Sequence, residues 1–166
     1  MKARWIGAGL AALAALIWIV SLSGGDERAL RKALRTITQD LEKEGPEKLW
    51  TAERRADRIA RRFTQDPDVQ SSLSGLSFES RTDLRAMVFR ARATAERIRA
   101  RVDDVEIRVD PGRKTATLTG TVRVTLTGAG ETGDLFQEFE TGWVREEEAW
   151  LIATVRMREA IRRPGS

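Results

Sequence analysis

Three residue types with reactive side chains are missing from the 166-residue sequence, which contains no cysteine, histidine or tyrosine. Without cysteine, the chain can form no disulfide, thiolate nucleophile or thiolate metal site. Without histidine, it lacks the commonest general base and the commonest zinc ligand, which excludes serine–histidine triads and zinc hydrolases. The missing tyrosine removes a phenol that some isomerases use as an oxyanion donor. Catalysis would have to rest on Asp, Glu, Lys or Arg, and we expect no metal site and no cofactor.

The surplus of positive charge is small over most of the chain. Lys and Arg together number 29, and Asp and Glu together number 25. Lys2 and Arg4 lie in the first 25 residues, which contain no acid, so the other 141 residues hold 27 bases against 25 acids. A basic patch is the usual sign of nucleic-acid binding. The charge balance does not favour a nucleic-acid partner, although the arginines of residues 54–62 leave nucleic acid or anionic lipid headgroups open as an alternative.

An uninterrupted apolar segment occupies the N-terminus, since residues 5–22 carry no charge. At about 1.5 Å rise per residue, a helix of this length is just long enough to cross a bilayer core. Lys2 and Arg4 precede the segment, and Trp5 and Trp18 are expected to flank it near the membrane interfaces. The sequence predicts a single-pass anchor in the inner (cytoplasmic) membrane, with the following domain on the periplasmic or extracellular side.

The residues after the apolar segment, Leu22-Ser23-Gly24-Gly25, resemble a bacterial lipoprotein cleavage signal. Gly25 stands where cysteine would be required, and it has no sulfur to accept a lipid, which excludes lipidation. Cleavage after Ser23 stays open, but the apolar segment exceeds the usual signal-peptide core of about 7–15 residues, which favours a retained anchor. The predicted domains are an anchor with a short hinge (1–25), a folded domain (26–160) and a tail (161–166).

Apolar residues at helical spacing predict three helices. The first has Asp26 as its N-cap, and Gly45-Pro46 separates it from the second, which ends at Asp66-Pro67-Asp68. The third begins at Ser80, which resembles a capping box with Asp83. The positions expected to face the core are Leu30, Leu34, Ile37 and Leu41, then Trp50, Ala56, Ile59 and Phe63, and finally Leu84, Met87, Val88, Ala91, Ala95, Ile98 and Val102.

The second half of the chain shows the alternating pattern of β-strands. Residues 69–80 are predicted to form a loop with one or two short strands. Four longer strands follow, with apolar residues alternating from Val105 to Met157, and Asp110-Pro111-Gly112-Arg113 predicts a tight turn after the first of them. Threonines on the polar side of residues 115–125 suit an exposed sheet face. Helices grouped before an antiparallel sheet indicate an α+β domain with its helices on one face.

This order of elements resembles the nuclear transport factor 2-like, or SnoaL-like, superfamily. The resemblance rests on the paired N-terminal helices, on "FESRTDLRAMV" entering the third helix, on the hairpin before "KTATLTGTVRVTL", and on the closing "FETGWVREEEAWLIATVRM". It covers about residues 26–160. It implies a cone, in which three helices pack on a curved, mostly antiparallel sheet, here preceded by a transmembrane helix. Membrane-anchored members with an N-terminal apolar helix look similar.

The resemblance alone does not decide an activity, because the superfamily includes isomerases, dehydratases and non-enzymatic scaffolds. Its enzymes place Asp, His, Tyr or Arg inside the cone. The predicted strands here put no acidic pair on their apolar face. Asp83 is expected to serve as a helix cap and Arg156 as a rim contact, rather than as catalytic residues. We therefore predict a non-enzymatic, membrane-tethered binding or assembly module, which pairs with a second copy or with other proteins through its sheet face.

The alternative is a small apolar ligand, or a cryptic enzyme, in the cone. Phe139 and Trp143 on one predicted strand, with Trp150 and Ile152 on the next, are the candidate lining of such a pocket. Aromatic-lined pockets with few polar groups suit apolar ligands. The same four residues can instead simply fill the core.

Overall fold

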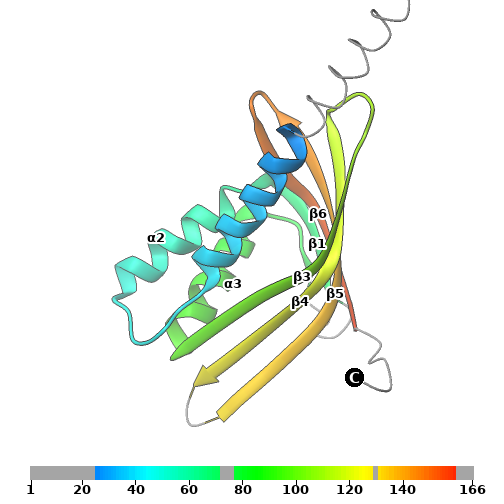
Figure 1. Cartoon of the computed structure of the whole chain (residues 1–166). Helices are drawn as coiled ribbons and strands as arrows, with labels where there is room; N and C mark the ends of the chain where they lie inside the picture. The colour runs from blue at the N-terminus through cyan, green and yellow to red at the C-terminus, as the bar shows by residue number, and fades with distance from the viewer. Residues whose placement is uncertain (1–24, 72–76, 129–130, 160–166) are drawn as a thin grey trace, which may run out of the picture.

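The computed structural model describes residues 25–71, 77–128 and 131–159, which form three helices packed on one side of a six-stranded sheet (Figure 1). We call residues 25–41 the N-terminal helix. The other elements are α2 (Leu49–Ala60), β1 (Phe63–Ser71), β2 (Ser77–Phe78), α3 (Arg81–Thr94), β3 (Arg97–Val109), β4 (Thr115–Gly128), β5 (Glu131–Glu146) and β6 (Ala149–Glu159). The α+β prediction, with its helices grouped on one face, is confirmed.

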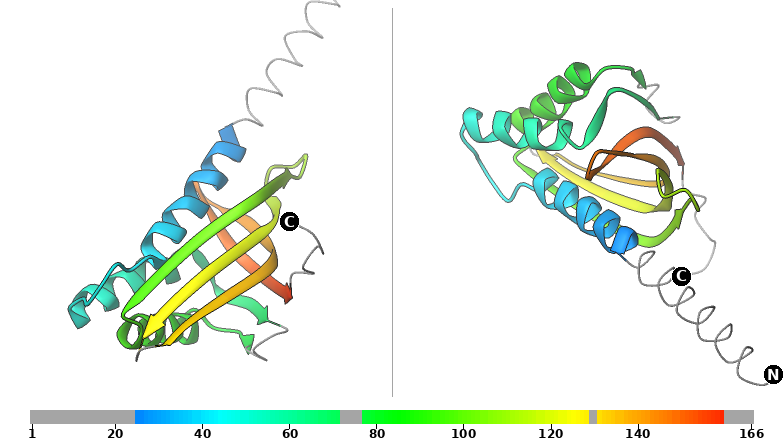
Figure 2. Two further views of the ribbon diagram at one scale, coloured as in Figure 1. Left: turned by 60° about the horizontal axis from the view of Figure 1, so that its bottom comes forward. Right: turned by 90° about the horizontal axis from the view of Figure 1, so that it is seen from above.

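The sheet has the strand order β2-β1-β6-β5-β4-β3. The strands β3 to β6 follow one another as antiparallel neighbours, whereas β1 pairs with β6 in parallel. The register shifts between Asp103 and Glu106, where Asp104 has a φ of 54°, and again between Gly142 and Trp143. Such bulges bend a strand, and the sheet curves around the helices (Figure 2).

The core lies between the helices and the face of the sheet that they cover, which we call the inner face. Alternate residues of β4, β5 and β6 point to this side, and the residues between them form the outer face. The buried residues that meet there are Leu30 and Ala33 of the N-terminal helix, Ala56 and Ile59 of α2, Leu84 and Val88 of α3, and Phe63, Ala116, Leu118, Phe139, Trp143, Trp150, Ile152 and Val155 of the sheet.

The second helix is shorter than predicted. It begins at Leu49 rather than at Pro46, and it ends at Ala60, so Phe63 lies in β1. The prediction that Trp50 is buried is wrong, since 53% of this residue is exposed. The inward stripe of α2 consists of small residues and Ile59, and at about 100° per residue Trp50 points away from Ala52.

The stop predicted at Asp66-Pro67-Asp68 lies inside β1. Proline fits there because the pairing of β1 with β6 is interrupted between Phe63 and Asp68, so no ladder hydrogen bond is lost. The third helix also ends earlier than the apolar stripe, at Thr94, and Ile98 and Val102 belong to β3. A spacing of four residues fits a strand as well as a helix, so the stripe continues across the boundary.

The two predicted helix caps have different outcomes. Ser80 is the N-cap of α3, and its hydroxyl accepts a hydrogen bond from the backbone N–H of Asp83 at 3.1 Å, as predicted. Asp26 is not a cap, because Gly25 before it is already helical. Its carboxylate instead accepts a hydrogen bond from Arg145 at 3.0 Å, which fixes the N-terminal helix to the sheet.

No helix among the described residues is long and apolar enough to cross a membrane. The predicted anchor lies outside the described residues, and so does the predicted tail. The anchor comprises residues 5–22, including Trp5 and Trp18, and is flanked by Lys2 and Arg4. The tail comprises residues 161–166.

Candidate functional site

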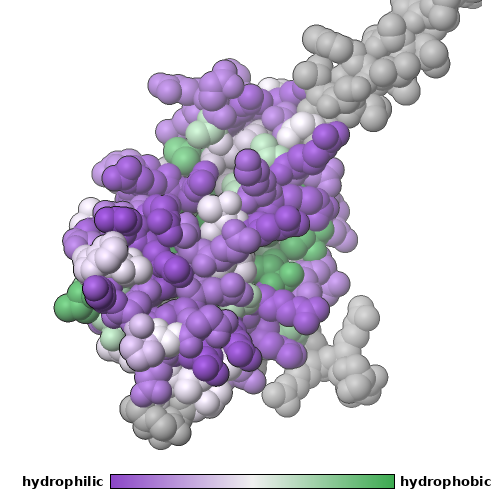
Figure 3. All heavy atoms as spheres, turned by 60° about the vertical axis from the view of Figure 1, so that its left-hand side comes forward, coloured by the Kyte–Doolittle hydropathy of each residue, from purple (hydrophilic) through white to green (hydrophobic). Residues whose placement is uncertain are grey.

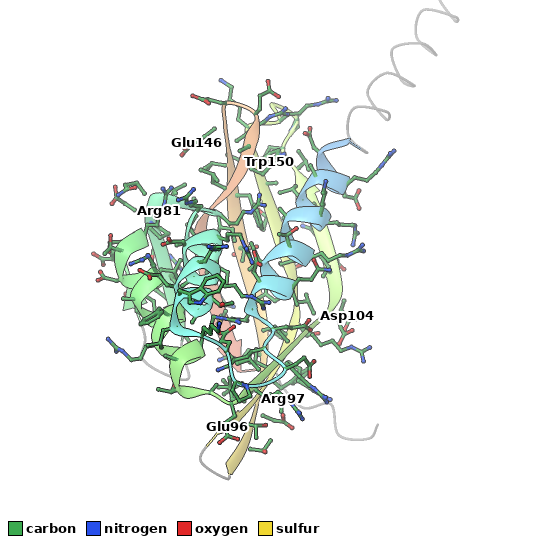
Figure 4. All side chains as sticks on the ribbon, turned by 90° about the vertical axis from the view of Figure 1, so that its left-hand side faces the viewer. Arg81, Glu96, Arg97, Asp104, Glu146 and Trp150 are labelled. Carbon is green, nitrogen blue, oxygen red and sulfur yellow. The ribbon has the colours of Figure 1, made fainter. Side chains whose placement is uncertain are left out.

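The four residues predicted to line a pocket lie close together on the inner face. Phe139 and Trp143 of β5 and Trp150 and Ile152 of β6 are between 1% and 7% exposed, and all four belong to the core cluster. Figure 4 shows Trp150 near the end of the domain where the N-terminal helix starts. Their predicted role in binding a ligand stays a prediction.

Polar groups on the inner face mostly satisfy one another. Trp143 donates its indole N–H to the hydroxyl of Thr141 at 2.8 Å, and that hydroxyl donates to the carbonyl oxygen of Leu118 at 3.3 Å. Gln137 lies on the same face and is only 7% exposed. Gln137 is not among the predicted site residues, although its position two residues before Phe139 places it on the apolar side of the strand.

Two buried cations lie where the helices end. Arg92 has no exposed surface, and its guanidinium binds the Glu47 carboxylate at 2.8 and 2.9 Å. Lys43 is 7% exposed and donates its ammonium group to the carbonyls of Arg92 and Ala95. Both charges are therefore fully engaged by carbonyl and carboxylate oxygens. Neither residue is predicted from the sequence, because nothing local distinguishes them among the 29 lysines and arginines.

The outer face of the sheet carries a hollow of about 330 Å³ that is lined by charged side chains. Glu138 and Glu140 project from β5, and Arg156 and Arg158 project from the neighbouring strand β6. Glu140 lies opposite Arg156, and Glu138 lies opposite Arg158. The remaining lining residues are Asp104, Glu106, Thr119, Gly120, Thr121 and Phe139. An acidic stripe on β5 thus runs beside a basic stripe on β6.

These stripes do not neutralise each other. Arg156 turns toward β1, where its guanidinium donates to the carboxylate of Asp68 at 2.5 Å and to its carbonyl at 3.0 Å. The hydrogen bond from Arg156 lowers the pKa of Asp68 below its ordinary value. Glu138, Glu140 and Arg158 form no ion pair with any other residue that the structure describes. Within the same residues, no cluster of three or more potential ligands could hold a metal ion.

Residues 50–156 match the model of the family described as SnoaL-like domain. No curated protein matches the chain. A solved structure from Novosphingobium aromaticivorans, named after scytalone dehydratase, has a TM-score of 0.72 at 12% identity, over 86% of this chain and 89% of the other. The function-unknown protein Rv3472(D26N) of Mycobacterium tuberculosis has a TM-score of 0.68 at 18% identity, over 85% and 75%.

A third solved structure, an ntf2-like protein with a cystatin-like fold from Novosphingobium aromaticivorans, covers 93% of this chain and 92% of its own. Its TM-score is 0.64 at 15% identity. Identities this low show a shared fold and nothing about activity. Together with the family match, they confirm the predicted resemblance in fold.

Proposed function

The chain belongs to the SnoaL-like domain family, and we propose that it is a non-enzymatic binding and assembly module that pairs with a second copy of itself through the outer face of its sheet. The family provides a scaffold rather than an activity, so function has to be argued from particular surfaces. The observation that supports pairing is the acidic stripe beside the basic stripe on the outer face, Glu138 and Glu140 next to Arg156 and Arg158.

Such a surface is complementary to itself. In a two-fold symmetric dimer, a residue i of one subunit that contacts residue j of the other is matched by a second, identical contact between j and i. The axis we propose runs along the strands between β5 and β6, so that Glu138 of one copy faces Arg158 of the second. Charge complementarity of this kind fixes the register of an interface and speeds encounter. The short side chains of Thr119 and Thr121 beside the stripes leave room for the partner's longer ones.

The packing of the inner face supports a role without chemistry. Large aromatic residues fill the space under the helices, and Trp143 is only 1% exposed. The two buried cations, Arg92 and Lys43, already bind backbone carbonyls and Glu47. Groups held in this way are structural, because catalytic groups need access to a substrate.

We also propose that residues 5–22 hold the module in the cytoplasmic membrane, with the domain on the outer side. The uncharged segment itself, preceded by Lys2 and Arg4, supports this tether. The test is extraction of native membranes with alkaline carbonate, followed by protease treatment of intact spheroplasts. Retention in the pellet together with external cleavage is expected, and release into the supernatant would contradict the tether.

Pairing is tested by sedimentation velocity of the full chain in a non-ionic detergent over a range of micromolar concentrations. The expected result is a reversible monomer–dimer equilibrium that weakens as salt is added, because the contacts are ionic. A single monomeric species at every concentration would contradict pairing.

Gln137 favours a second candidate function, the binding of a small apolar ligand that carries one hydrogen-bonding group. The side chain of Gln137 lies among the apolar residues of the inner face, where a ligand could form a hydrogen bond with its amide. Native mass spectrometry of the full chain would then show a bound small molecule, which the Gln137→Leu variant would lose. Absence of any bound mass in the wild-type protein would count against this candidate.

A further inference from the structure

An exposed apolar pair begins α2. Leu49 is 66% exposed and Trp50 is 53% exposed, which are the largest values among the large hydrophobic residues of the described chain. Apolar surface left in water forgoes the stabilisation that burial provides, at about 25 cal/mol per Å². Two such residues side by side, a leucine and a tryptophan, mark a contact surface more often than a scattered single residue does.

The charges around this pair are positive and uncompensated. The guanidinium of Arg54 lies 4.8 Å from the centre of the Trp50 ring, and Lys48 precedes the pair. No described carboxylate forms an ion pair with Lys48 or Arg54. The acids nearby are already bound elsewhere, since Glu47 pairs with Arg92 and Glu53 pairs with Arg85. The first turn of α2 contains no acidic residue either.

The pair also has a distinct position in the domain. The N-terminal helix runs from residue 25 at one end to the end where α2 begins (Figures 1 and 2), over about 25 Å for its seventeen residues. Hydrophilic side chains cover most of the side that carries the helices, and the hydrophobic ones form small separate groups (Figure 3). The start of α2 thus lies at the end of the domain opposite residue 25, where the proposed tether would attach.

We propose that Lys48, Leu49, Trp50 and Arg54 form a docking patch for an acidic segment of a partner protein. An apolar side chain of that segment packs on Leu49 and Trp50, and its carboxylates pair with Lys48 and Arg54. Tryptophan and arginine are the residues that dominate binding energy at protein interfaces. The inference rests on the proposed tether, because a tether attached at residue 25 joins the domain at the end opposite the patch, which favours a protein over lipid as the occupant. The patch is separate from the outer face, where the second copy binds.

The test replaces Trp50 in the full chain with the photoreactive residue p-benzoylphenylalanine, in the cells that naturally make the protein. Irradiation is expected to give one discrete adduct with another protein, and peptide mapping is expected to place the cross-link beside several Asp or Glu residues. Arg54→Glu should reduce the adduct about tenfold or more, as expected for the loss of an interfacial charge pair. Arg61→Glu, the same charge reversal at the exposed C-terminal end of α2, is the matched control and should leave the adduct unchanged.

Each other outcome overturns the proposal. The patch has a different occupant if the adduct forms with lipid, with a second copy of the chain or with a neutral protein segment. If no adduct forms, the patch binds no partner. Circular dichroism confirms that each variant is folded. Carbonate extraction of the same cells tests the tether separately. A chain that is retained in membranes without a protein adduct contradicts the patch alone, and a chain that is washed off but still cross-linked to an acidic segment contradicts the tether alone.

Discussion

Arg92 and Lys43 cap each other's helices. Arg92, in α3, donates to the carbonyl oxygens of Asp40 and Leu41 at the end of the N-terminal helix, at 2.8 and 2.7 Å. Lys43, just beyond that helix, donates to the carbonyl oxygens of Arg92 and Ala95 at the end of α3, at 2.8 and 2.5 Å. The last carbonyls of a helix lack intrahelical partners and carry partial negative charge, so cations stabilise them. Two helices far apart in the sequence are thereby joined at their C-terminal ends.

Replacing Arg92 with methionine is expected to lower the free energy of unfolding by about 3–5 kcal/mol, because the Glu47 carboxylate, only 13% exposed, would lose its partner. The measurement is urea denaturation followed by circular dichroism. Arg31→Met is the matched control. Arg31 also pairs with a carboxylate, that of Glu27 at 2.9 Å, but both side chains are nearly half exposed, so a loss of about 0–1 kcal/mol is expected. Equal losses in the two variants would contradict the capping role.

Thr64→Val is expected to stabilise the protein. The hydroxyl oxygen of Thr64 is buried and has no hydrogen-bond partner among the described residues, and valine keeps the shape of the side chain. Removing an unpaired buried hydroxyl should raise the free energy of unfolding by about 1 kcal/mol. Scanning calorimetry measures the change in Tm. Thr141→Val provides the contrast, since its hydroxyl binds both Trp143 and Leu118 and its loss should lower the Tm.

The ion pair between Asp68 and Arg156 predicts a pH dependence of stability. The hydrogen bond from Arg156 lowers the pKa of Asp68 in the folded protein below its value in the unfolded chain. The ionised carboxylate therefore stabilises the fold above the unfolded pKa of about 3.9, and this contribution disappears as the pH falls through the lower folded pKa.

Asp68→Asn should accordingly be less stable than the wild type near neutral pH, and the difference should shrink below about pH 4. Urea unfolding of both proteins at several pH values measures it. Asp66→Asn removes an exposed carboxylate two residues earlier on the same strand and controls for the loss of one charge. A difference that stays constant down to acidic pH would show that the ion pair does not act through the ionised Asp68.

The features predicted correctly from the sequence are those with a local signal. The Ser80 cap is visible in four consecutive residues, and the alternation through β4 and β5 identifies a hairpin by itself. The inner position of Phe139 and Trp143 followed from the same alternation. The outward position of Glu138 and Glu140 follows from it too, since they occupy the intervening positions. That they lie beside a basic stripe depends on which strand pairs with β5, and the alternation does not indicate this.

The features that were missed depend on contacts between distant parts of the chain. The parallel pairing of β1 with β6 joins segments more than 80 residues apart. Pro67 led to the prediction of a helix end where the structure has strand β1. The burial of Arg92 is decided by the end of the N-terminal helix, about 50 residues earlier. The exposure of Trp50 results from how α2 packs on α3, which the hydrophobicity of the residue cannot indicate.

The central claim is that opposite charges on β5 and β6 pair one copy with a second. Two charge-reversed forms of the full chain test it most directly, one with Glu138→Arg and the other with Arg158→Glu, because neither residue has an ion pair within the described part of its own chain. Sedimentation velocity should show the wild type pairing, each variant alone monomeric because like charges face each other, and the equimolar mixture dimeric because every contact is again complementary. A wild type that stays monomeric, or variants that still pair with themselves, would contradict the claim.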